Sequence, residues 1–269
     1  MNTPMAILND LTKCLGCRSC QVACKAWNRL PGQQTSNLGG YENPVHLSDQ
    51  TWTRLCFFEN QDDSRPVWVF SKRQCMHCLE PACVAACPVG AMQKTAAGPV
   101  IYHKEKCIGC RYCMVACPYT IPRFDWRSSV PYITKCTMCA DRLGAGMAPA
   151  CSQACPNDAL FFGPRKHLLS LARDRLRQEP HNYVNHIYGE HEAGGASVLY
   201  ISPIAFDRLG LPALGRKPVS HYSSEIMNKV PLAFVGVAAA LGGIYWISKR
   251  REELKQGEQD PDAPHDDNS

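Results

Sequence analysis

The 269-residue sequence lacks the signatures of several large protein classes. No Gly-rich dinucleotide fingerprint follows a predicted strand, and the nine histidines are dispersed, so we predict no catalytic site on this chain. No basic stretch, apolar run or twin arginine precedes the first cysteines, and we therefore expect no export signal of its own. With 45% hydrophobic and 20% charged residues, the composition excludes a disordered, collagen-like or purely membrane-embedded chain.

Cysteine, by contrast, is abundant. The 17 cysteines are less dense than in small disulfide scaffolds, and their odd number would leave one thiol unpaired. Sixteen of them form four quartets, and Cys56 stands alone. The quartets are Cys14, Cys17, Cys20 and Cys24; Cys75, Cys78, Cys83 and Cys87; Cys107, Cys110, Cys113 and Cys117; and Cys136, Cys139, Cys151 and Cys155. Each opens with C-x-x-C and closes with C-x-x-x-C, and three end in Cys-Pro.

This spacing predicts [4Fe–4S] clusters. Three thiolates at successive steps of three residues wrap a short loop around one cluster, and the fourth cysteine of the motif ligates a second cluster. Quartets therefore act in pairs, and four quartets predict four clusters. If the second and third quartets pair as neighbours, the first pairs with the fourth by elimination, which the sequence alone does not prove.

A structural zinc protein is the main alternative, because C-x-x-C pairs also form Cys₄ zinc sites. Zinc sites use two separated pairs, whereas these quartets place three cysteines at successive steps and a fourth before proline. The pattern favours iron–sulfur clusters.

The remaining sequence predicts an α+β fold. The predicted elements are a helix over 18–29, a loop over 30–50, strands over 51–59 and 66–71 joined by a turn, a hairpin over 91–102, a strand over 159–162, and an amphipathic helix over 164–178 with Pro164 in its first position. Helical turns are expected just before Cys87 and Cys117.

These elements predict two ferredoxin-like modules in tandem. The predicted four-cluster domain covers residues 1–163, with an inner module at about 72–120 and an outer module formed by 5–29 and 130–163. Residues 164–229 are predicted to be a helix and an irregular extension over the surface of this domain or of a partner, with few regular elements.

Residues 230–248 predict a transmembrane helix. These nineteen residues carry no charge, and at about 1.5 Å per residue they span roughly 28 Å, close to the hydrocarbon thickness of a bilayer. A buried globular helix is disfavoured, because Lys249, Arg250 and Arg251 follow and an acidic tail comes next. Residues 249–269 are predicted to be disordered.

Lysine and arginine are more frequent after this segment than before it, with Lys249, Arg250, Arg251 and Lys255 against Lys229. The positive-inside rule predicts a cytoplasmic C-terminus and a periplasmic cluster domain in a bacterial cytoplasmic membrane. Since we expect no signal peptide, our hypothesis is that the domain is exported while bound to a partner that carries a twin-arginine signal.

The cysteine stretches resemble those of a known family. They lie at residues 14–28, 75–88, 107–119 and 135–156, and all sixteen cysteine positions match. The chain is similar to the four-cluster iron–sulfur subunits of bacterial membrane oxidoreductases, which include those of formate dehydrogenase-N, uptake hydrogenase and the dimethyl sulfoxide and polysulfide reductases. The single C-terminal span resembles the formate dehydrogenase and hydrogenase partners more than the reductase subunits, which lack it.

The resemblance implies four interleaved ligand sets. Cluster A would be held by Cys14, Cys17, Cys20 and Cys155; cluster B by Cys24, Cys136, Cys139 and Cys151; cluster C by Cys75, Cys78, Cys83 and Cys117; and cluster D by Cys87, Cys107, Cys110 and Cys113.

The resemblance also implies the function. The chain would relay single electrons through four [4Fe–4S] clusters between a large catalytic subunit, with molybdenum, tungsten or nickel–iron, and an integral membrane cytochrome b or quinone-reactive subunit. A formate dehydrogenase or uptake hydrogenase complex is favoured, and another molybdenum reductase is the alternative.

Three other features receive simpler interpretations. Cys56 is expected to be a buried small residue in a strand, His77 a surface residue or a neighbour of a cluster, and His221 a polar residue near the membrane interface. The formal charge of +5 is no sign of nucleic-acid binding, because four clusters with their thiolates would add about −8.

Overall fold

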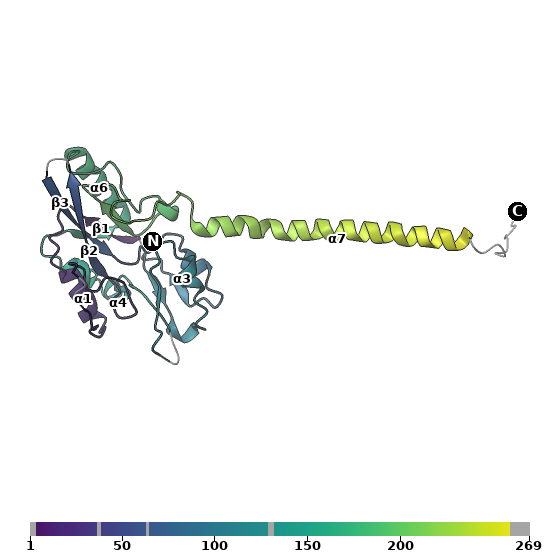
Figure 1. Cartoon of the computed structure of the whole chain (residues 1–269), viewed down its shortest axis with the longest axis horizontal. Helices are drawn as coiled ribbons and strands as arrows, with labels where there is room; N and C mark the ends of the chain where they lie inside the picture. Colours follow the sequence, from purple (N-terminus) through teal and green to yellow (C-terminus); the bar gives the residue numbers. More distant parts are fainter. Residues whose placement is uncertain (1–3, 37–38, 63–64, 129–131, 259–269) are drawn as a thin grey trace. The chain divides into compact units, whose positions relative to one another are not determined.

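The computed structural model describes residues 4–36, 39–62, 65–128 and 132–258. The chain divides into two units, one ending at Ser220 and the other beginning at His221. Figure 1 shows the strands and short helices of the first unit, and the long helix that makes up the second. The strands are β1 (Met5–Asp10), β2 (Arg54–Asp62), β3 (Arg65–Arg73), β4 (Met92–Lys94), β5 (Val100–Tyr102), β6 (Arg123–Phe124), β7 (Ile133–Thr134), β8 (Leu160–Pro164) and β9 (Val198–Ile201). The α-helices are α1 (Ser19–Trp27), α2 (Ala82–Ala85), α3 (Tyr112–Ala116), α4 (Ala140–Gly144), α5 (Ala150–Gln153), α6 (Arg165–Gln178) and α7 (Val219–Glu258).

β1 is the centre of a three-stranded sheet with the order β8–β1–β9. Leu8 lies opposite Phe161 of antiparallel β8 and opposite Leu199 of parallel β9. The last five residues of β1 are all buried, including Asn9 and Asp10. Asn9 Nδ2 donates to the Leu199 carbonyl at 3.0 Å, and the carboxylate of Asp10 forms an ion pair with Arg175. The sheet therefore joins the N-terminal segment to two segments more than 150 residues later.

α6 supplies a second layer beside this sheet (Figure 1). Its buried residues are Leu168, Leu169 and Ala172, which pack in one cluster with Leu8 and Leu199. This confirms the amphipathic helix that the sequence predicts. Pro164 was predicted at the first helical position, but the helix begins at Arg165 and Pro164 directly precedes it. The fixed φ and missing N–H of proline cost nothing in this position.

The hairpins and short helices predicted around the cysteines are also present. β2 and β3 form the first predicted hairpin, and β4 and β5 the second. Cys56 in β2 is 1% exposed and lies opposite Ser71, which confirms the expected buried residue. α2 and α3 pack against each other just before Cys87 and Cys117, while α1 packs against α5.

The prediction of an irregular surface extension after residue 178 is wrong in one respect. β9 pairs with β1, and Val198, Leu199 and Ile201 are fully buried in the core. Four apolar residues cannot be distinguished from a buried loop by their pattern alone, and only the open edge of β1 gives them a partner. Residues 198–201 are therefore part of the fold of the first unit.

The predictions for the C-terminal segment need a second correction. α7 is longer than the predicted span of 230–248 at both ends, and residues 249–258 are helical although a disordered tail was predicted there. Pairs one turn apart account for this, such as Arg250 with Glu253 at 3.6 Å and Lys229 with Glu225 at 3.5 Å. Residues 259–269 of the predicted tail lie outside the described residues.

The described part of the chain contains one helix that is long and apolar enough to cross a membrane. Its most apolar window has a mean hydropathy of 1.9, and no residue of that window is buried. His221 lies in the first turns of this helix, 3.8 Å from Glu225.

We predict that Leu199→Ala destabilises the first unit by about 2–5 kcal/mol, because it leaves a cavity between β1, β9 and α6. A lower midpoint of thermal unfolding for the purified chain measures this effect. Leu254→Ala, at a leucine that is 56% exposed, serves as the control and should change the midpoint little. Equal midpoints for both variants would contradict a core role for β9.

Candidate iron–sulfur sites

The loops that carry the cysteines share one backbone conformation. Gly16 and Gly109, in the C-x-G-C segments of the first and third quartets, have φ of 70° and 71°. Arg18 and Arg111, two residues later, have φ of 63° and 64°. Left-handed residues at this spacing curl the backbone into a concave loop with its amide groups turned inward, and glycine adopts this conformation without steric cost.

Backbone amides in these loops donate to the cysteine sulfurs. The N–H of Gly109 donates to Cys107 Sγ at 3.4 Å, and that of Met138 donates to Cys136 Sγ at 3.4 Å. The N–H of Ala91 donates to Cys87 Sγ at 3.2 Å in the same manner. Such bonds stabilise a thiolate more than a thiol, so the loops are suited to metal-bound sulfur.

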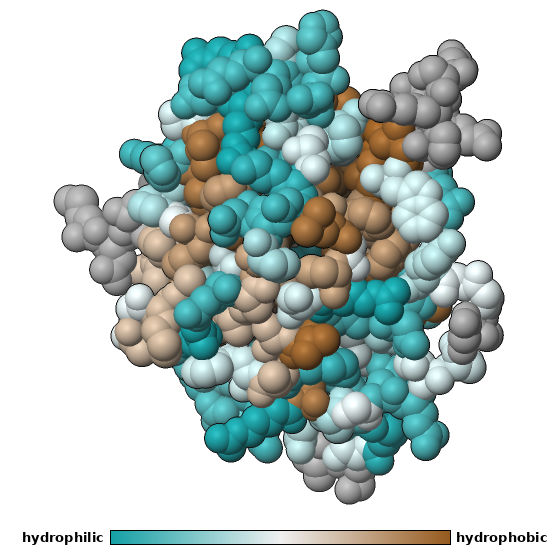
Figure 2. Space-filling view, turned by 90° about the vertical axis from the view of Figure 1, so that its left-hand side faces the viewer, coloured by the Kyte–Doolittle hydropathy of each residue, from teal (hydrophilic) through white to brown (hydrophobic). Residues whose placement is uncertain are grey.

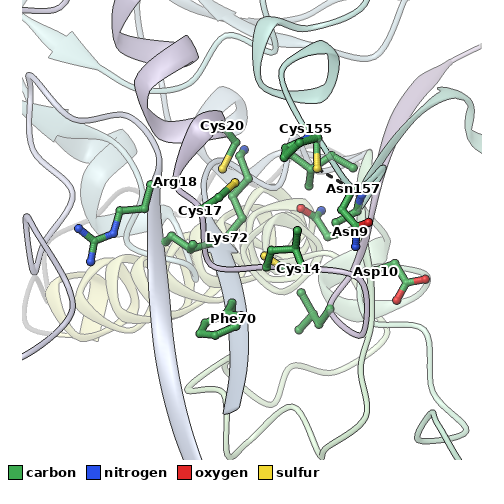
Figure 3. Close-up of a pocket in the computed structure, with 16 residues that line it drawn as sticks. Asn9, Asp10, Cys14, Cys17, Arg18, Cys20, Phe70, Lys72, Cys155 and Asn157 are labelled. Carbon is green, nitrogen blue, oxygen red and sulfur yellow. Dashed lines mark hydrogen bonds between the residues drawn. The ribbon is translucent and has the colours of Figure 1, made fainter.

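The first cavity, cavity A, is lined by four cysteines from distant parts of the chain (Figure 3). Cys14 and Cys17 come from the loop between β1 and α1, Cys20 from α1, and Cys155 from the segment after α5. Lys72 of β3 lines the same cavity. These four cysteines are the set that the resemblance implies for cluster A.

Cavity B is lined by Cys24, Cys136, Cys139 and Cys151, all of which are buried. Cavity D is lined by Cys87, Cys107, Cys110 and Cys113. Both sets coincide with those implied for clusters B and D. A single helical turn of α1 separates a cysteine of cavity A from one of cavity B, which explains the interleaving.

The fourth set is also close together, and Cys117 packs against Cys75. Burial, followed by the thiolates of Cys75, Cys117 and Cys83, raises the pKa of Cys78. Burial and the Cys75 thiolate likewise raise the pKa of Cys83 to about 12. The set implied for cluster C therefore lies together: Cys75 and Cys78 come from the loop after β3, Cys83 from α2, and Cys117 from the residue after α3.

Burial makes these thiols poor acids in the absence of metal. It raises the pKa of Cys20, Cys113 and Cys136 to about 12 in each case. Each would stay protonated near pH 7 unless a cation bound its sulfur, and metal binding therefore has to displace these protons.

The shape of the sites suits a cluster better than a single ion. Within the described ranges, no three His, Cys, Asp or Glu side chains converge closely enough to hold one metal ion. Four sulfurs of a zinc site would all lie about 2.3 Å from one point. Here the sulfurs instead surround cavities, as a [4Fe–4S] cluster requires.

Two buried donors without partners are further evidence of fit. Gln74 is 2% exposed, and its Nε2 has no hydrogen-bond partner among the described residues, although the residue lines cavity B. His77 accepts a bond from the Val100 N–H at its Nδ1 at 2.9 Å, so the proton of the neutral ring is on Nε2, which has no partner there either. Unpaired buried donors are costly, and cluster sulfur would satisfy them.

His77 was predicted to be a surface residue or a neighbour of a cluster. It is fully buried, which excludes the first alternative and leaves the second. Burial and the charges of Lys135, Lys94 and Lys72 hold its pKa well below the usual value, and the ring is neutral.

Comparison with known proteins agrees with this geometry. A family described as "4Fe–4S dicluster domain" matches residues 66–165, and another with the same description matches residues 13–91. The iron–sulfur subunit of the nitrate-inducible formate dehydrogenase of Escherichia coli K12 is 36% identical over 245 residues, 89% of this chain and 83% of that subunit. The chain belongs to this family of iron–sulfur subunits.

Other relatives extend the comparison. A protein of Nitratidesulfovibrio vulgaris strain Hildenborough is 42% identical over 258 residues, 94% of this chain and 69% of that protein. The hydrogenase-2 operon protein HybA of E. coli O157:H7 is 33% identical over 280 residues, 91% of this chain and 84% of HybA.

Membership in the family confirms the predicted cofactors and role. Two dicluster regions carry four [4Fe–4S] clusters, and the chain is an electron-transfer subunit of an oxidoreductase complex, without a catalytic site of its own. The dicluster matches exclude the zinc alternative. The division into inner and outer modules stays a prediction.

Sequence reasoning missed the buried polar residues between the cysteine sets. Lys72, Gln74 and Lys135 are 2%, 2% and 3% exposed. Lys135 stands directly before Cys136, but a lysine in a cysteine-rich loop is equally compatible with exposure. Only the contacts of the folded chain identify these three as buried.

We predict that Cys24→Ser reduces the iron content from about sixteen to about twelve atoms per chain, because one of four clusters loses a ligand. Cys56→Ser is the matched control at another buried cysteine and should keep about sixteen. Iron and acid-labile sulfide analysis of anaerobically purified protein measures both. Full iron in Cys24→Ser, or loss in Cys56→Ser, would contradict the assignment.

Proposed function

We propose that the chain relays single electrons through its clusters in the order A, B, C, D. Each cluster is held by the set of four cysteines that the resemblance implies. Each cluster supplies a one-electron redox couple. The observation that carries this order is the adjacency of the cysteine sets. Cys20 of set A packs in one cluster with Cys151 of set B. Cys136 of set B packs with Cys75 of set C, and Cys83 of set C packs with Cys113 of set D.

Exposure supports the same order. All four cysteines of set B are buried, as are Cys75 and Cys83 of set C. Set A contains the exposed Cys17, and three cysteines of set D are half-buried. The two ends of the series therefore reach the surface, where partners can approach, while the middle is shielded from water.

Apolar side chains surround both ends. Leu15 and Val22 are 62% and 64% exposed near set A, and Ile108 and Val115 are 66% and 88% exposed near set D. Figure 2 shows that one face of the first unit carries apolar patches among hydrophilic residues. Exposed apolar patches of this kind are typical of surfaces that bind other proteins.

The partners follow from the relatives. Their names refer to formate dehydrogenase and to hydrogenase-2, which supports a catalytic subunit of one of these two types at one end of the series. A membrane cytochrome b or quinone-reactive subunit would occupy the other end.

The membrane arrangement is part of the proposal. α7 would anchor the chain in the bacterial cytoplasmic membrane, with the cluster domain in the periplasm and Lys249, Arg250 and Arg251 on the cytoplasmic side. The loaded domain would be exported while bound to a catalytic subunit with a twin-arginine signal.

The order of the relay predicts complementary effects of ligand loss at its two ends. Cys20→Ser removes a ligand of cluster A, and Cys113→Ser removes a ligand of cluster D. In the assembled complex without acceptor, substrate should reduce the three remaining clusters in one of these variants and no cluster in the other. The reason is that one variant breaks the relay at the acceptor end and the other at the donor end. Cluster reduction is followed by absorbance bleaching and EPR. Identical behaviour of the two variants would contradict the order.

The membrane orientation predicts that external protease digests the cluster domain in spheroplasts. Replacing Lys249, Arg250 and Arg251 with glutamine should leave part of the chain protected, because the charges that retain the C-terminus in the cytoplasm are removed. Immunoblotting with antibodies against the cluster domain measures the protected fraction. A wild-type domain that is protected until the membrane is lysed would contradict the orientation.

A further inference from the structure

Lys72 occupies the boundary between the two cavities of the outer module. It lines cavity A (Figure 3) and also cavity B. Its side chain is buried, with 2% of the residue exposed. Cavity B has no other charged residue in its lining among the described residues. A buried charge is costly unless opposite charge lies nearby, and its placement here needs an explanation.

The surroundings of Lys72 supply negative charge from sulfur. Its ammonium donates to the neutral Oε1 of Gln74. Burial lowers the pKa of Lys72, but the thiolates of Cys151, Cys20 and Cys136 outweigh burial and raise it overall. Two of these cysteines belong to set B and one to set A. Lys72 also lines both cavities, so the two sets share it.

Gln74 adds a second, independent observation. Its Oε1 is held by Lys72, so its amide has a fixed direction, and its buried Nε2 is without a partner in the described part of the chain. Gln74 lines cavity B and is absent from the lining of cavity A. An amide donor in this position is suited to the sulfur of a cluster in cavity B.

Lys72 has a counterpart elsewhere in the unit. Lys135 is 3% exposed. Burial raises the pKa of Cys83 and Cys117 of set C, and the charge of Lys135 opposes that rise. Its ammonium donates to the carbonyl oxygens of Val100 and Cys136. In set D the main electrostatic influences on Cys113 are other thiols. Buried lysines therefore act on particular clusters and not uniformly on all four.

We propose that Lys72 and the Gln74 amide that it orients set the reduction potentials of clusters A and B, with the charge acting on both clusters and the amide acting on B alone. This rests on the proposed ligand sets. Reduction adds one electron, delivered along the relay, and one negative charge to a cluster. A fixed positive charge and an N–H donor toward sulfur both stabilise the reduced form and raise its potential.

The test is a redox titration, monitored by EPR, of the complex purified with Lys72→Met, Lys72→Arg or Gln74→Leu. In Lys72→Met we expect the equilibrium constants for reduction of clusters A and B to fall at least tenfold, which lowers each reduction potential by about 59 mV for one electron. The potentials of clusters C and D should be unchanged. Lys72→Arg keeps the charge and should keep both potentials. Gln74→Leu should lower the reduction potential of cluster B and leave that of cluster A unchanged. Lys135→Met is the positional control and should lower the reduction potential of cluster C.

Iron content separates this proposal from the ligand sets on which it rests. Full iron with unchanged potentials in Lys72→Met would overturn the proposal and leave the ligand sets intact, as would an equal shift of all four clusters. If Lys72→Met loses clusters A and B, the result from Lys72→Arg decides. If Lys72→Arg retains both clusters at wild-type potentials, the positive charge is required and the proposal is supported. If Lys72→Arg also loses both clusters, Lys72 is a purely structural residue and the proposal is overturned.

Discussion

The structure depends on the burial of thiols that function only when ionised. Burial raises the pKa of Cys20, Cys83, Cys113 and Cys136 to about 12, so the protein alone opposes the charge that its ligands require. Iron supplies the compensating charge, and cluster binding is thereby coupled to folding. Backbone amides aimed at sulfur and buried lysines contribute in the same direction. This constraint explains why the first unit is built from tight loops and helices of one or two turns around the cavities.

Such loops need a frame, and the sheet β8–β1–β9 provides it. β1 leads directly into the first quartet, β8 follows directly after the fourth, and β9 closes the other edge of β1. The pairing of β1 with β8 brings Cys14 and Cys155 to one cavity although 141 positions separate them in the sequence. Asp10 reinforces the frame, since its buried carboxylate is held by Arg175 of α6 and by the hydroxyl of Tyr183.

The sequence was most informative where the chemistry is local. Cysteine spacing depends on the geometry of a loop around a cluster, and the hairpin over 91–102 and the helix over 164–178 follow from turn residues and apolar periodicity; all of these were predictable. β9 was not, because four apolar residues acquire a partner only when β1 is in place. The buried positions of His77, Lys72 and Gln74 were also inaccessible, since only contacts made in the folded chain identify them, such as the bond from Lys72 to Gln74 and that from the Val100 N–H to His77. The extension of α7 to Glu258 reflects side-chain pairs that a composition-based prediction of disorder overlooks.

The proposed relay is a linear series in which A neighbours B, B neighbours C, and C neighbours D. The most direct measurement is the EPR spectrum of the fully reduced chain, recorded as the clusters are reduced one after another. Each newly reduced cluster should broaden and split the signal only of its immediate neighbours, and the integrated intensity should approach four spins per chain. Two spins, or four signals that add without interaction, would contradict a continuous series of four adjacent clusters.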